Sequence, residues 1–275
     1  MTDAKGRYLK AARGSAAAIM ARYSTSFGLA ARLSGRRIGG DLACLYAVVR
    51  VADEIVDGAA PEEERAALLS DYRRRALAAP GEEFSPDPVL HAFGELARRC
   101  SFPAEPLEAF FSSMARDLDP APLAEGELED YVYGSAEAVG LLCLAVFFEG
   151  PPNDHELEAD ARRLGRALQY VNFVRDLGVD ERELGRSYLG ALTDSDKDRL
   201  LAEATGDLEA ARLAAARLPR RARVGVRVAA GLYEELARRL SRLSVAEISQ
   251  RRVSVPAAAK ARIAAREAWL SRVAP

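Results

Sequence analysis

The sequence is poor in the side chains that bind transition metals or form disulfides. It contains two histidines and three cysteines in 275 residues. Cys44, Cys100 and Cys143 are far apart and none belongs to a CxxC pair, so neither a disulfide framework nor a zinc ribbon is predicted. Neither His91 nor His155 follows a glutamate by three residues, which excludes the Glu-x-x-His pairs of a di-iron helical bundle.

A basic excess and a long apolar run are missing too. The net charge is −2 and the pI is near 5.9, which argues against a nucleic-acid partner. No unbroken run approaches the roughly 18 to 20 apolar residues of a membrane span, and the apolar run at 16–20 is too short for a signal peptide. The GxSxG, P-loop and Rossmann fingerprints are absent. We therefore expect a soluble, cytoplasmic protein that holds any anionic ligand with individually placed arginines or metals.

Alternating stretches long enough for strands are absent, and proline and glycine are concentrated in a few breaks. Between these breaks, apolar residues recur at helical spacing. The predicted helices are 7–22, 38–58, 61–79, 88–99, 104–116, 127–148, 155–184, 195–217, 219–243 and 255–272. Because no break resembles a flexible linker, the sequence predicts one all-α domain over residues 1–275.

Two of the predicted helices carry a polar stripe on an otherwise apolar body. A helix that is apolar nearly all round is normally buried, so these stripes are expected in the interior. At 3.6 residues per turn, the members of each stripe fall on one face. The stripes consist of Tyr46, Arg50, Asp53 and Asp57 on the first helix and Gln169, Asn172, Asp176 and Asp180 on the second.

Paired aspartates inside a protein require a positive partner. A buried carboxylate loses its hydration, and two carboxylates one helical turn apart repel each other. Mg²⁺ takes oxygen ligands and commonly bridges carboxylates to substrate phosphates, while Arg50 and Arg175 are placed to grip phosphate oxygens. One DxxxD is usually a solvated acidic face, but two in apolar surroundings favour a site that clamps diphosphate and ionises an allylic substrate.

Five blocks, in order along the chain, resemble the squalene/phytoene synthase family. They begin with YSTSF at 23–27 and continue with LYA through Arg50 to DEIVD at 45–57. The others are YVYGSA with a later Val-Gly at 131–140, LGRALQYVNFVRD at 164–176 with its extension to 188, and RVSVP at 252–256. The details around Ala47 to Arg50 and around YVYGSAE at 131–137 resemble actinobacterial phytoene synthases in particular.

This resemblance implies a helical bundle of the trans-isoprenyl diphosphate synthase type around a central cavity. Family members join two prenyl diphosphates head to head through a cyclopropylcarbinyl diphosphate, and phytoene synthases use two molecules of geranylgeranyl diphosphate without NADPH. The implied cofactor is Mg²⁺, with Mn²⁺ as the alternative ion. The implied metal ligands are Asp53, Asp57, Asn172, Asp176 and Asp180; the substrate contacts are Ser24, Ser26, Arg50, Gln169, Asn172, Arg175 and Arg186; and Tyr133 is implied beside the reacting cation.

The chain departs from the family pattern near the second aspartate motif. Val179 precedes Asp180 where many members have glutamate, and the spacing from Asp180 to Arg186 is one residue longer. The following segment 189–193 is shortened and lacks the usual proline. These departures leave the exact substrate open.

Several alternatives therefore remain. The protein could be a family relative that uses farnesyl diphosphate, or one that passes its prenyl group to an aromatic acceptor. A third possibility is a helical scaffold protein without catalytic activity. Ser24 and Ser26 are also ordinary helix N-caps, and Tyr133 is also an ordinary core aromatic. The basic C-terminal region, including Arg252 and Arg266, suggests peripheral contact with the inner face of the membrane. The sequence does not indicate an oligomeric state.

Overall fold

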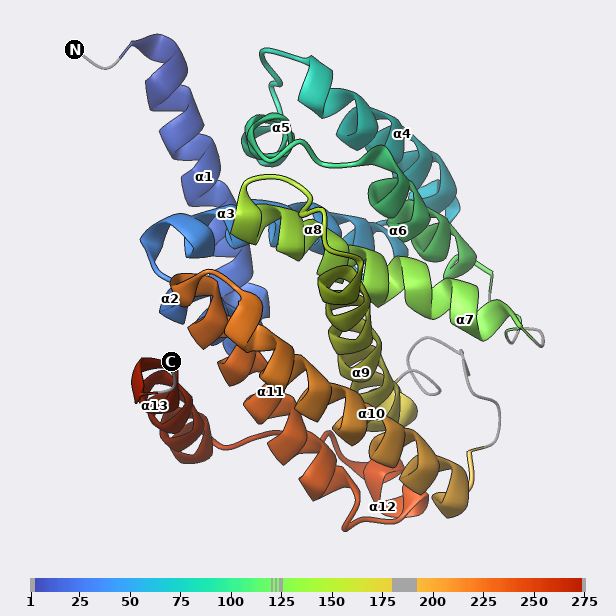
Figure 1. The fold of residues 1–275 in the computed structure, drawn as a ribbon. Helices are drawn as coiled ribbons and strands as arrows, with labels where there is room; N and C mark the ends of the chain where they lie inside the picture. The colour runs from blue at the N-terminus through green and yellow to red at the C-terminus, as the bar shows by residue number, and fades with distance from the viewer. Residues whose placement is uncertain (1–2, 120, 122, 124–125, 180–191, 274–275) are drawn as a thin grey trace.

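The computed structural model describes residues 3–119, 121, 123, 126–179 and 192–273, and every regular element within them is helical. Figure 1 shows the course of the chain. The α-helices are α1 (Ala4–Tyr23), α2 (Thr25–Leu33), α3 (Arg36–Val56), α4 (Arg65–Ala78), α5 (Pro88–Arg99), α6 (Ala104–Arg116), α7 (Glu127–Val132), α8 (Ala138–Phe148), α9 (His155–Val179), α10 (Asp194–Ala214), α11 (Arg220–Leu240), α12 (Val245–Gln250) and α13 (Ala257–Val273).

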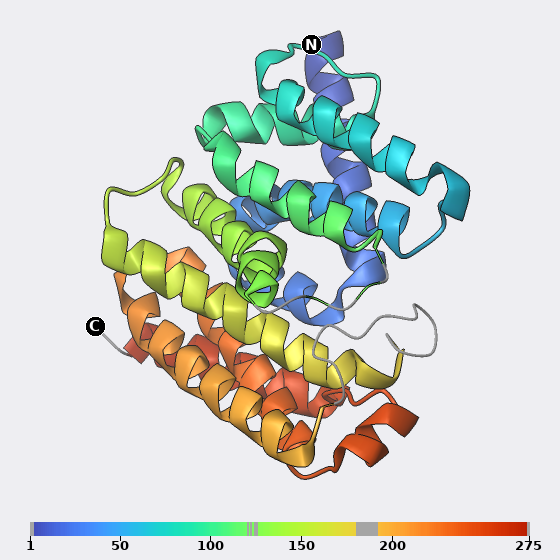
Figure 2. The same ribbon diagram turned by 90° about the vertical axis from the view of Figure 1, so that its right-hand side faces the viewer.

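The helices pack around two main apolar clusters. The first is built by α1, α3, α4, α5, α6 and α8, the second by α9 to α13, and α2 contributes residues to both. Figure 2 shows the same division, with α9 crossing the molecule between the N-terminal helices and α10 to α13. The interior between the two clusters is where the cavity described below lies.

Local sequence explains where many helices begin. Asp87 caps α5 by accepting from the amides of Val89 and Leu90, and Pro88 occupies the first turn, where its missing N–H costs nothing. Thr193 and Asp196 form a capping box at the start of α10. The predicted ranges for α5 and α6 are confirmed to the residue.

The sequence did not predict α2 and α12. With nine and six residues, both are shorter than the windows in which helical periodicity is reliable. Such short helices are marginal alone and depend on tertiary packing. Here α2 packs against α3 and α11, and α12 packs against α9.

The helix predicted over 127–148 is interrupted by a π-helical turn at Tyr133–Glu137, which separates α7 from α8. Gly134 lies in this turn, so close to the carbonyl of Ala109 on α6 that no side chain would fit. The whole stretch is long and apolar enough to cross a membrane by length and composition. More than half of its most apolar window is buried in the fold, and buried core helices meet the same criterion, so this feature is weak evidence of a membrane span.

Two glycines allow α9 to approach α8 and the π-helical turn before it closely. A Cβ at Gly140 would lie 2.5 Å from the carbonyl oxygen of Ala161, and one at Gly165 would lie 2.5 Å from that of Ala136. Both neighbours are backbone atoms, which move only with their helices. This contact fixes the inner face of α9, on which the second polar stripe lies.

Replacing Gly165 with alanine should destabilise the fold, because the new methyl group has to push α9 away from the π-helical turn that precedes α8. Overpacking of this kind costs about 1–3 kcal/mol, which lowers the Tm by about 2–4 °C per kcal/mol for a chain of this size. Gly14→Ala is the control, because Gly14 is exposed in α1 and an added methyl group there would have no neighbour within 4 Å. The control should keep or slightly raise the Tm in a thermal melt; equal Tm values for the two variants would contradict the close contact.

Candidate active site

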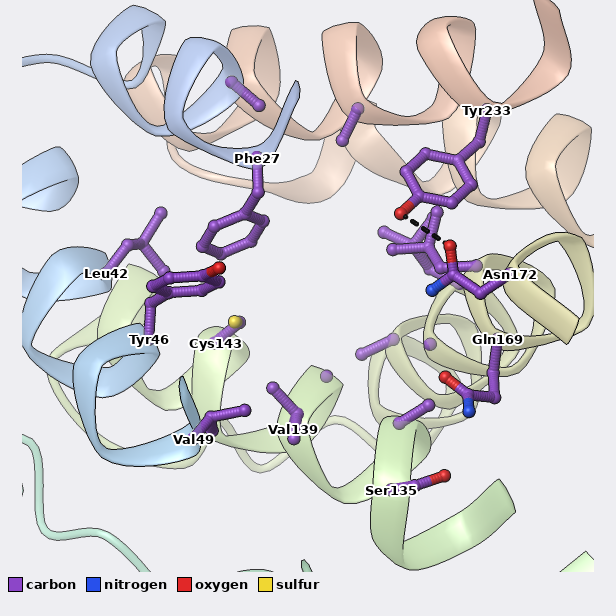
Figure 3. A pocket seen from close by; sticks show the side chains of 18 of the residues that line it. Phe27, Leu42, Tyr46, Val49, Ser135, Val139, Cys143, Gln169, Asn172 and Tyr233 are labelled. Atoms are coloured by element: carbon purple, nitrogen blue, oxygen red, sulfur yellow. Dashed lines mark hydrogen bonds between the residues drawn. The ribbon is translucent and has the colours of Figure 1, made fainter. Parts of the chain in front are cut away.

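A cavity of about 720 Å³ lies between the two apolar clusters and is lined by residues of α2, α3, α6, α8, α9, α10 and α11. Figure 3 looks into it and shows Tyr46 and Val49 facing Gln169 and Asn172 across the open space. One end is rich in charged side chains, whereas the other is almost wholly apolar. We call these the polar mouth and the distal end.

The stripe predicted on α3 faces this cavity, because Tyr46, Arg50, Asp53 and Asp57 all line it. Arg50 holds Asp53 with an Nη1–Oδ2 distance of 2.6 Å and also pairs with Glu54. The ring of Tyr23 lies 4.3 Å from the Arg50 guanidinium carbon. Arg50 is therefore fixed between an aromatic face and two carboxylates at the polar mouth.

The stripe on α9 reaches the same mouth with Gln169, Asn172 and Asp176, and Arg175 lines the cavity beside it. The Nε of Arg175 donates to Oδ1 of Asp176 at 2.8 Å. Burial disfavours the guanidinium charge, but the hydrogen bond and the attraction of Asp176 outweigh burial and raise the pKa of Arg175. Arg175 therefore keeps its charge inside the protein.

The carboxylates at the mouth fit Mg²⁺ by donor type, although they do not form a ready-made cage. Within the described ranges, no group of three histidine, cysteine or acidic side chains is close enough to hold a metal. Arginines neutralise the carboxylates instead: Arg50 pairs with Asp53 and Arg175 with Asp176. Mg²⁺ is typically held by one or two carboxylates plus substrate phosphates, so an incomplete protein cage is what a metal–diphosphate site requires.

Two of the predicted site residues, Asp180 and Arg186, lie outside the described residues. Ser24 was predicted both as a substrate contact and as a helix N-cap. It lines the cavity, and its hydroxyl accepts a hydrogen bond from the amide of Phe27 as the N-cap of α2. Ser26, in contrast, is not among the residues that line the cavity. Of the two serines, the structure therefore brings only Ser24 to the candidate site.

The predicted place of Tyr133 needs correction. Its hydroxyl donates to the Glu105 carboxylate on α6, with both oxygens at 2.8 Å, and the residue does not line the cavity. Burial and this hydrogen bond raise the pKa of Tyr133 to about 12. Residues two apart on a helix point in nearly opposite directions, so Tyr131 faces the cavity instead and donates to Asp117 at 3.0 Å.

The sequence did not predict two residues that the fold brings to the mouth. Tyr233 on α11 donates its hydroxyl to Oδ1 of Asn172 at 3.2 Å (Figure 3). Arg252, predicted as part of a basic outer surface, lines the cavity and lies 3.3 Å from Oδ1 of Asp176. Arg252 opens a block shared with the family, which was the available signal, whereas no local pattern marks Tyr233.

The cavity follows α9 from the polar mouth to the distal end. Its lining includes a continuous inner face of the helix from Asp176 back to Asp160. These 16 residues span about 24 Å at the rise of an α-helix. The intervening lining residues on this face are mainly small or aliphatic: Ala161, Leu164, Gly165 and Leu168. The cavity is therefore a long apolar channel with a charged mouth.

Known proteins resemble this chain in sequence and in fold. The family model described as squalene/phytoene synthase matches residues 20–192. The chain is 31% identical over 262 residues to a 15-cis-phytoene synthase of a Paracoccus species, covering 86% of this chain and 84% of that protein. It is also 31% identical over 262 residues to a bifunctional lycopene cyclase/phytoene synthase of Leptosphaeria maculans, covering 80% of this chain and 45% of that one.

The fold is also found among solved structures. A dehydrosqualene synthase solved in complex with a ligand superimposes with a TM-score of 0.80 at 20% identity, covering 98% of this chain and 99% of that one. This likeness confirms the predicted helical fold. The chain spans 34% and 45% of the length of the first two curated relatives, which are bifunctional proteins.

Mg²⁺ together with inorganic diphosphate should stabilise the protein. At about 100 times the Kd, ligand linkage contributes about 2.7 kcal/mol, and the Tm should rise by about 5–10 °C. Asp53→Asn and Asp176→Asn should each abolish most of this rise, because each removes a carboxylate from the mouth.

The control for this experiment is Asp71→Asn, which changes an exposed carboxylate on α4 outside the cavity lining. It should retain the full shift in differential scanning fluorimetry. A wild-type Tm that does not change at saturating Mg²⁺ and diphosphate would argue against a metal–diphosphate site, as would a full shift in both mouth variants.

Proposed function

The chain belongs to the squalene/phytoene synthase family, and on this basis we propose that it is a prenyltransferase that condenses two molecules of geranylgeranyl diphosphate head to head into phytoene. The product would be a precursor for carotenoids, as the names of the matched phytoene synthases suggest. The reaction is proposed to need Mg²⁺, with Mn²⁺ as the alternative ion, and to need no NADPH.

The observation that carries this proposal is the cavity that joins a charged mouth to a long apolar wall. About 24 Å of α9 separates Asp176 from Asp160, and both line the cavity. An extended C20 tail has about 15 main-chain bonds and reaches about 19 Å, whereas a C15 tail reaches about 14 Å. The longer tail covers more of the apolar wall, so burial favours geranylgeranyl over farnesyl diphosphate.

A second tail needs room beside the first. The lining extends sideways to Phe110 and Met114 on α6, and to Val139 and Cys143 on α8. These side chains belong to the first apolar cluster or pack against it, whereas the α9 face borders the second. The width of the cavity between the two clusters therefore supports two prenyl chains lying side by side.

The residues at the mouth have the chemistry that ionisation requires. Arg50, Arg175 and Arg252 would grip the leaving diphosphate, and Asp53, Asp57, Asp176 and Asn172 would hold Mg²⁺. The metal, when bound, spreads the negative charge that develops on the leaving group. The stacked rings of Phe27 and Tyr46, with centroids 5.6 Å apart, line the cavity close by and offer π faces to an allylic cation.

The proposed reaction balances in two steps. Loss of diphosphate from one substrate gives an allylic cation. The π electrons of the C2–C3 double bond of the second substrate attack C1 of this cation to form a C–C bond, and the resulting tertiary cation loses a proton as the cyclopropane ring closes. The resulting prephytoene diphosphate loses its own diphosphate, rearranges and releases a second proton. Two diphosphates and two protons leave in all, and the absence of a net reduction is why no NADPH is required.

A second candidate keeps the same site but uses a shorter donor. The structural neighbour named as a dehydrosqualene synthase has nearly the same length as this chain and the same fold. A farnesyl donor would leave part of the distal wall uncovered, and this is the observation that ranks it second. In the alternative with an aromatic acceptor, the aromatic molecule would take the place of the second prenyl diphosphate, which accepts the cation, and the ionising donor would stay the same.

Purified protein incubated with geranylgeranyl diphosphate and Mg²⁺, without NADPH, should form a C40 hydrocarbon and release two diphosphates per product. Gas chromatography or liquid chromatography with mass detection identifies the hydrocarbon, and a coupled assay counts the diphosphate. If the protein forms a C30 hydrocarbon from farnesyl diphosphate and no hydrocarbon from geranylgeranyl diphosphate, the second candidate replaces the proposal.

Ala161 offers a direct test of the length argument, because it lines the channel 15 residues before Asp176. Ala161→Phe should shorten the channel and lower kcat/KM for geranylgeranyl diphosphate relative to farnesyl diphosphate by at least about tenfold, since each displaced methylene costs discrimination. Ala161→Ser, which nearly keeps the volume, should leave the ratio unchanged in competition assays. If the phenylalanine variant has a normal Tm and an unchanged ratio of the two kcat/KM values, this part of the wall does not determine the preferred chain length.

A further inference from the structure

The distal end of the cavity is lined by a small apolar cluster that is separate from the two main ones. Leu144, Leu157, Ala215 and Leu218 all line the cavity and belong to a small separate cluster. We call these four residues the distal plug. They come from the end of α8, the start of α9 and the turn between α10 and α11, so parts of the chain that are far apart in sequence meet there (Figure 2).

Ion pairs near the surface tie the elements of the plug together. Arg217, in the turn before α11, bridges Asp154 at 2.5 Å, Glu156 at 3.3 Å and, at 3.9 Å, Asp160. Asp160 itself lines the cavity, whereas the side chain of Arg217 is 39% exposed. The cavity therefore comes within one ion pair of the protein surface at this end.

Exposed apolar side chains gather at the same end. Among the exposed large hydrophobic residues in the described part of the chain, three are relevant here: Phe148, Leu213 and Trp269. Phe148 follows the cavity residue Phe147, and Leu213 precedes the cavity residue Ala214. Leu213 and Trp269 are 74% and 61% exposed, which is unusual for side chains of this size.

The position of Trp269 follows from how α13 packs on α11. A Cβ at Gly231 would lie 3.1 Å from Ile263, and Glu267 pairs with Arg227 at 3.0 Å. Residue numbers thus fall along α11 as they rise along α13, so the two helices are antiparallel. Glu267 also pairs with Arg212 on α10, immediately before Leu213. The last turns of α13, with Trp269, therefore lie toward the N-terminal end of α11, where the plug is.

Three arginines lie at the same end of the molecule. Arg36, Arg220 and Arg221 are exposed, and none makes an ion pair with any other part of the chain that the structure describes. A Cβ at Gly35 would lie 3.4 Å from the Arg221 side chain, which places the start of α11 against the start of α3. We call Phe148, Leu213, Trp269, Arg36, Arg220 and Arg221 together the distal face.

We propose that the distal face docks on an anionic lipid bilayer and that the hydrocarbon product leaves the cavity there, through the distal plug. This inference rests on the proposed function, because a C40 hydrocarbon is the cargo. The product has lost both diphosphates, so nothing in it is attracted to the arginines and carboxylates of the polar mouth. Passage through that mouth would bring its apolar surface into contact with water and charged side chains, whereas the distal route is lined by apolar side chains apart from Asp160.

The features of the distal face match those of a bilayer surface. Arginines without carboxylate partners among the described residues are attracted to anionic headgroups, and an exposed tryptophan favours the boundary between headgroups and acyl chains. The ion pairs of Arg217 also have a role here, because headgroup phosphates compete for its guanidinium. Release of Arg217 from Asp154 and Asp160 would loosen the turn that carries Ala215 and Leu218.

The closing experiment uses the intact chain and its own tryptophan, since Trp269 is the one tryptophan in the sequence. Vesicles of phosphatidylcholine with phosphatidylglycerol should shift the Trp269 emission to the blue and sediment the protein, whereas pure phosphatidylcholine should do neither. The double variant Arg220→Glu/Arg221→Glu should bind the anionic vesicles at least about thirtyfold more weakly, given the contribution of each basic residue near such a surface.

The matched control is Arg7→Glu/Lys10→Glu, which makes the same charge change on exposed residues of α1. It should bind like the wild type. Equal losses in both double variants, unchanged binding in the distal variant, or equal binding to neutral vesicles would each overturn the docking proposal. A wild-type protein whose Trp269 emission does not change with anionic vesicles would overturn it as well.

Product exit has its own readout. Anionic vesicles should raise the steady-state turnover of the wild type by about threefold or more, because release of product into water limits such a reaction. The distal double variant should lose this stimulation but keep the single-turnover rate. If anionic vesicles still raise the turnover of this variant, the proposed exit route through the distal plug is wrong. Vesicle binding is measured without substrate, so failure to make any C40 hydrocarbon would overturn the proposed function and leave the binding result intact.

Discussion

The pairing of half-buried aspartates with arginines is the interaction on which the rest of this structure depends. Asp53 and Asp176 line the mouth of a largely apolar cavity, where partial loss of hydration favours a cationic partner for each carboxylate. Arg50 holds the first and Arg175 with Arg252 holds the second. These pairs let α3 and α9 place charged side chains on the cavity wall. In our proposal, an incoming metal and diphosphate would exchange partners with these pairs instead of entering an unpaired acidic site.

The contrast between the two ends of the cavity follows from how α9 is held. Gly140 and Gly165 let α9 meet α8 and the π-helical turn before it with almost no side chain between them, which fixes the inner face of α9 along the whole channel. That face is polar over its last turns and largely apolar before them. In our proposal, ionisation is thereby confined to one end of the cavity, while the hydrocarbon tails and the product occupy the other.

Particular residues show how far local reasoning reaches. Helical periodicity alone could place the stripe from Tyr46 to Asp57 on one face, because α3 and its C-cap carry all of its members. Tyr133 was misplaced, since the π-helical turn and its bond to Glu105 decide which face it presents. Tyr233 and Arg252 meet α9 from 61 and more residues away, and no local pattern encodes such a meeting.

The sequence by itself determined the helical class, most helix positions, the two aspartate stripes and, through its ordered blocks, the family. These properties depend on spacing along one helix or on residue identity, which the chain carries without folding. Only the tertiary structure decided that both stripes open into one cavity, how long that cavity is, and that apolar side chains and exposed arginines gather at its far end. Those facts depend on how distant helices pack. Arg217, Glu267, Gly140 and Gly165 all contact residues that are far from them in the sequence.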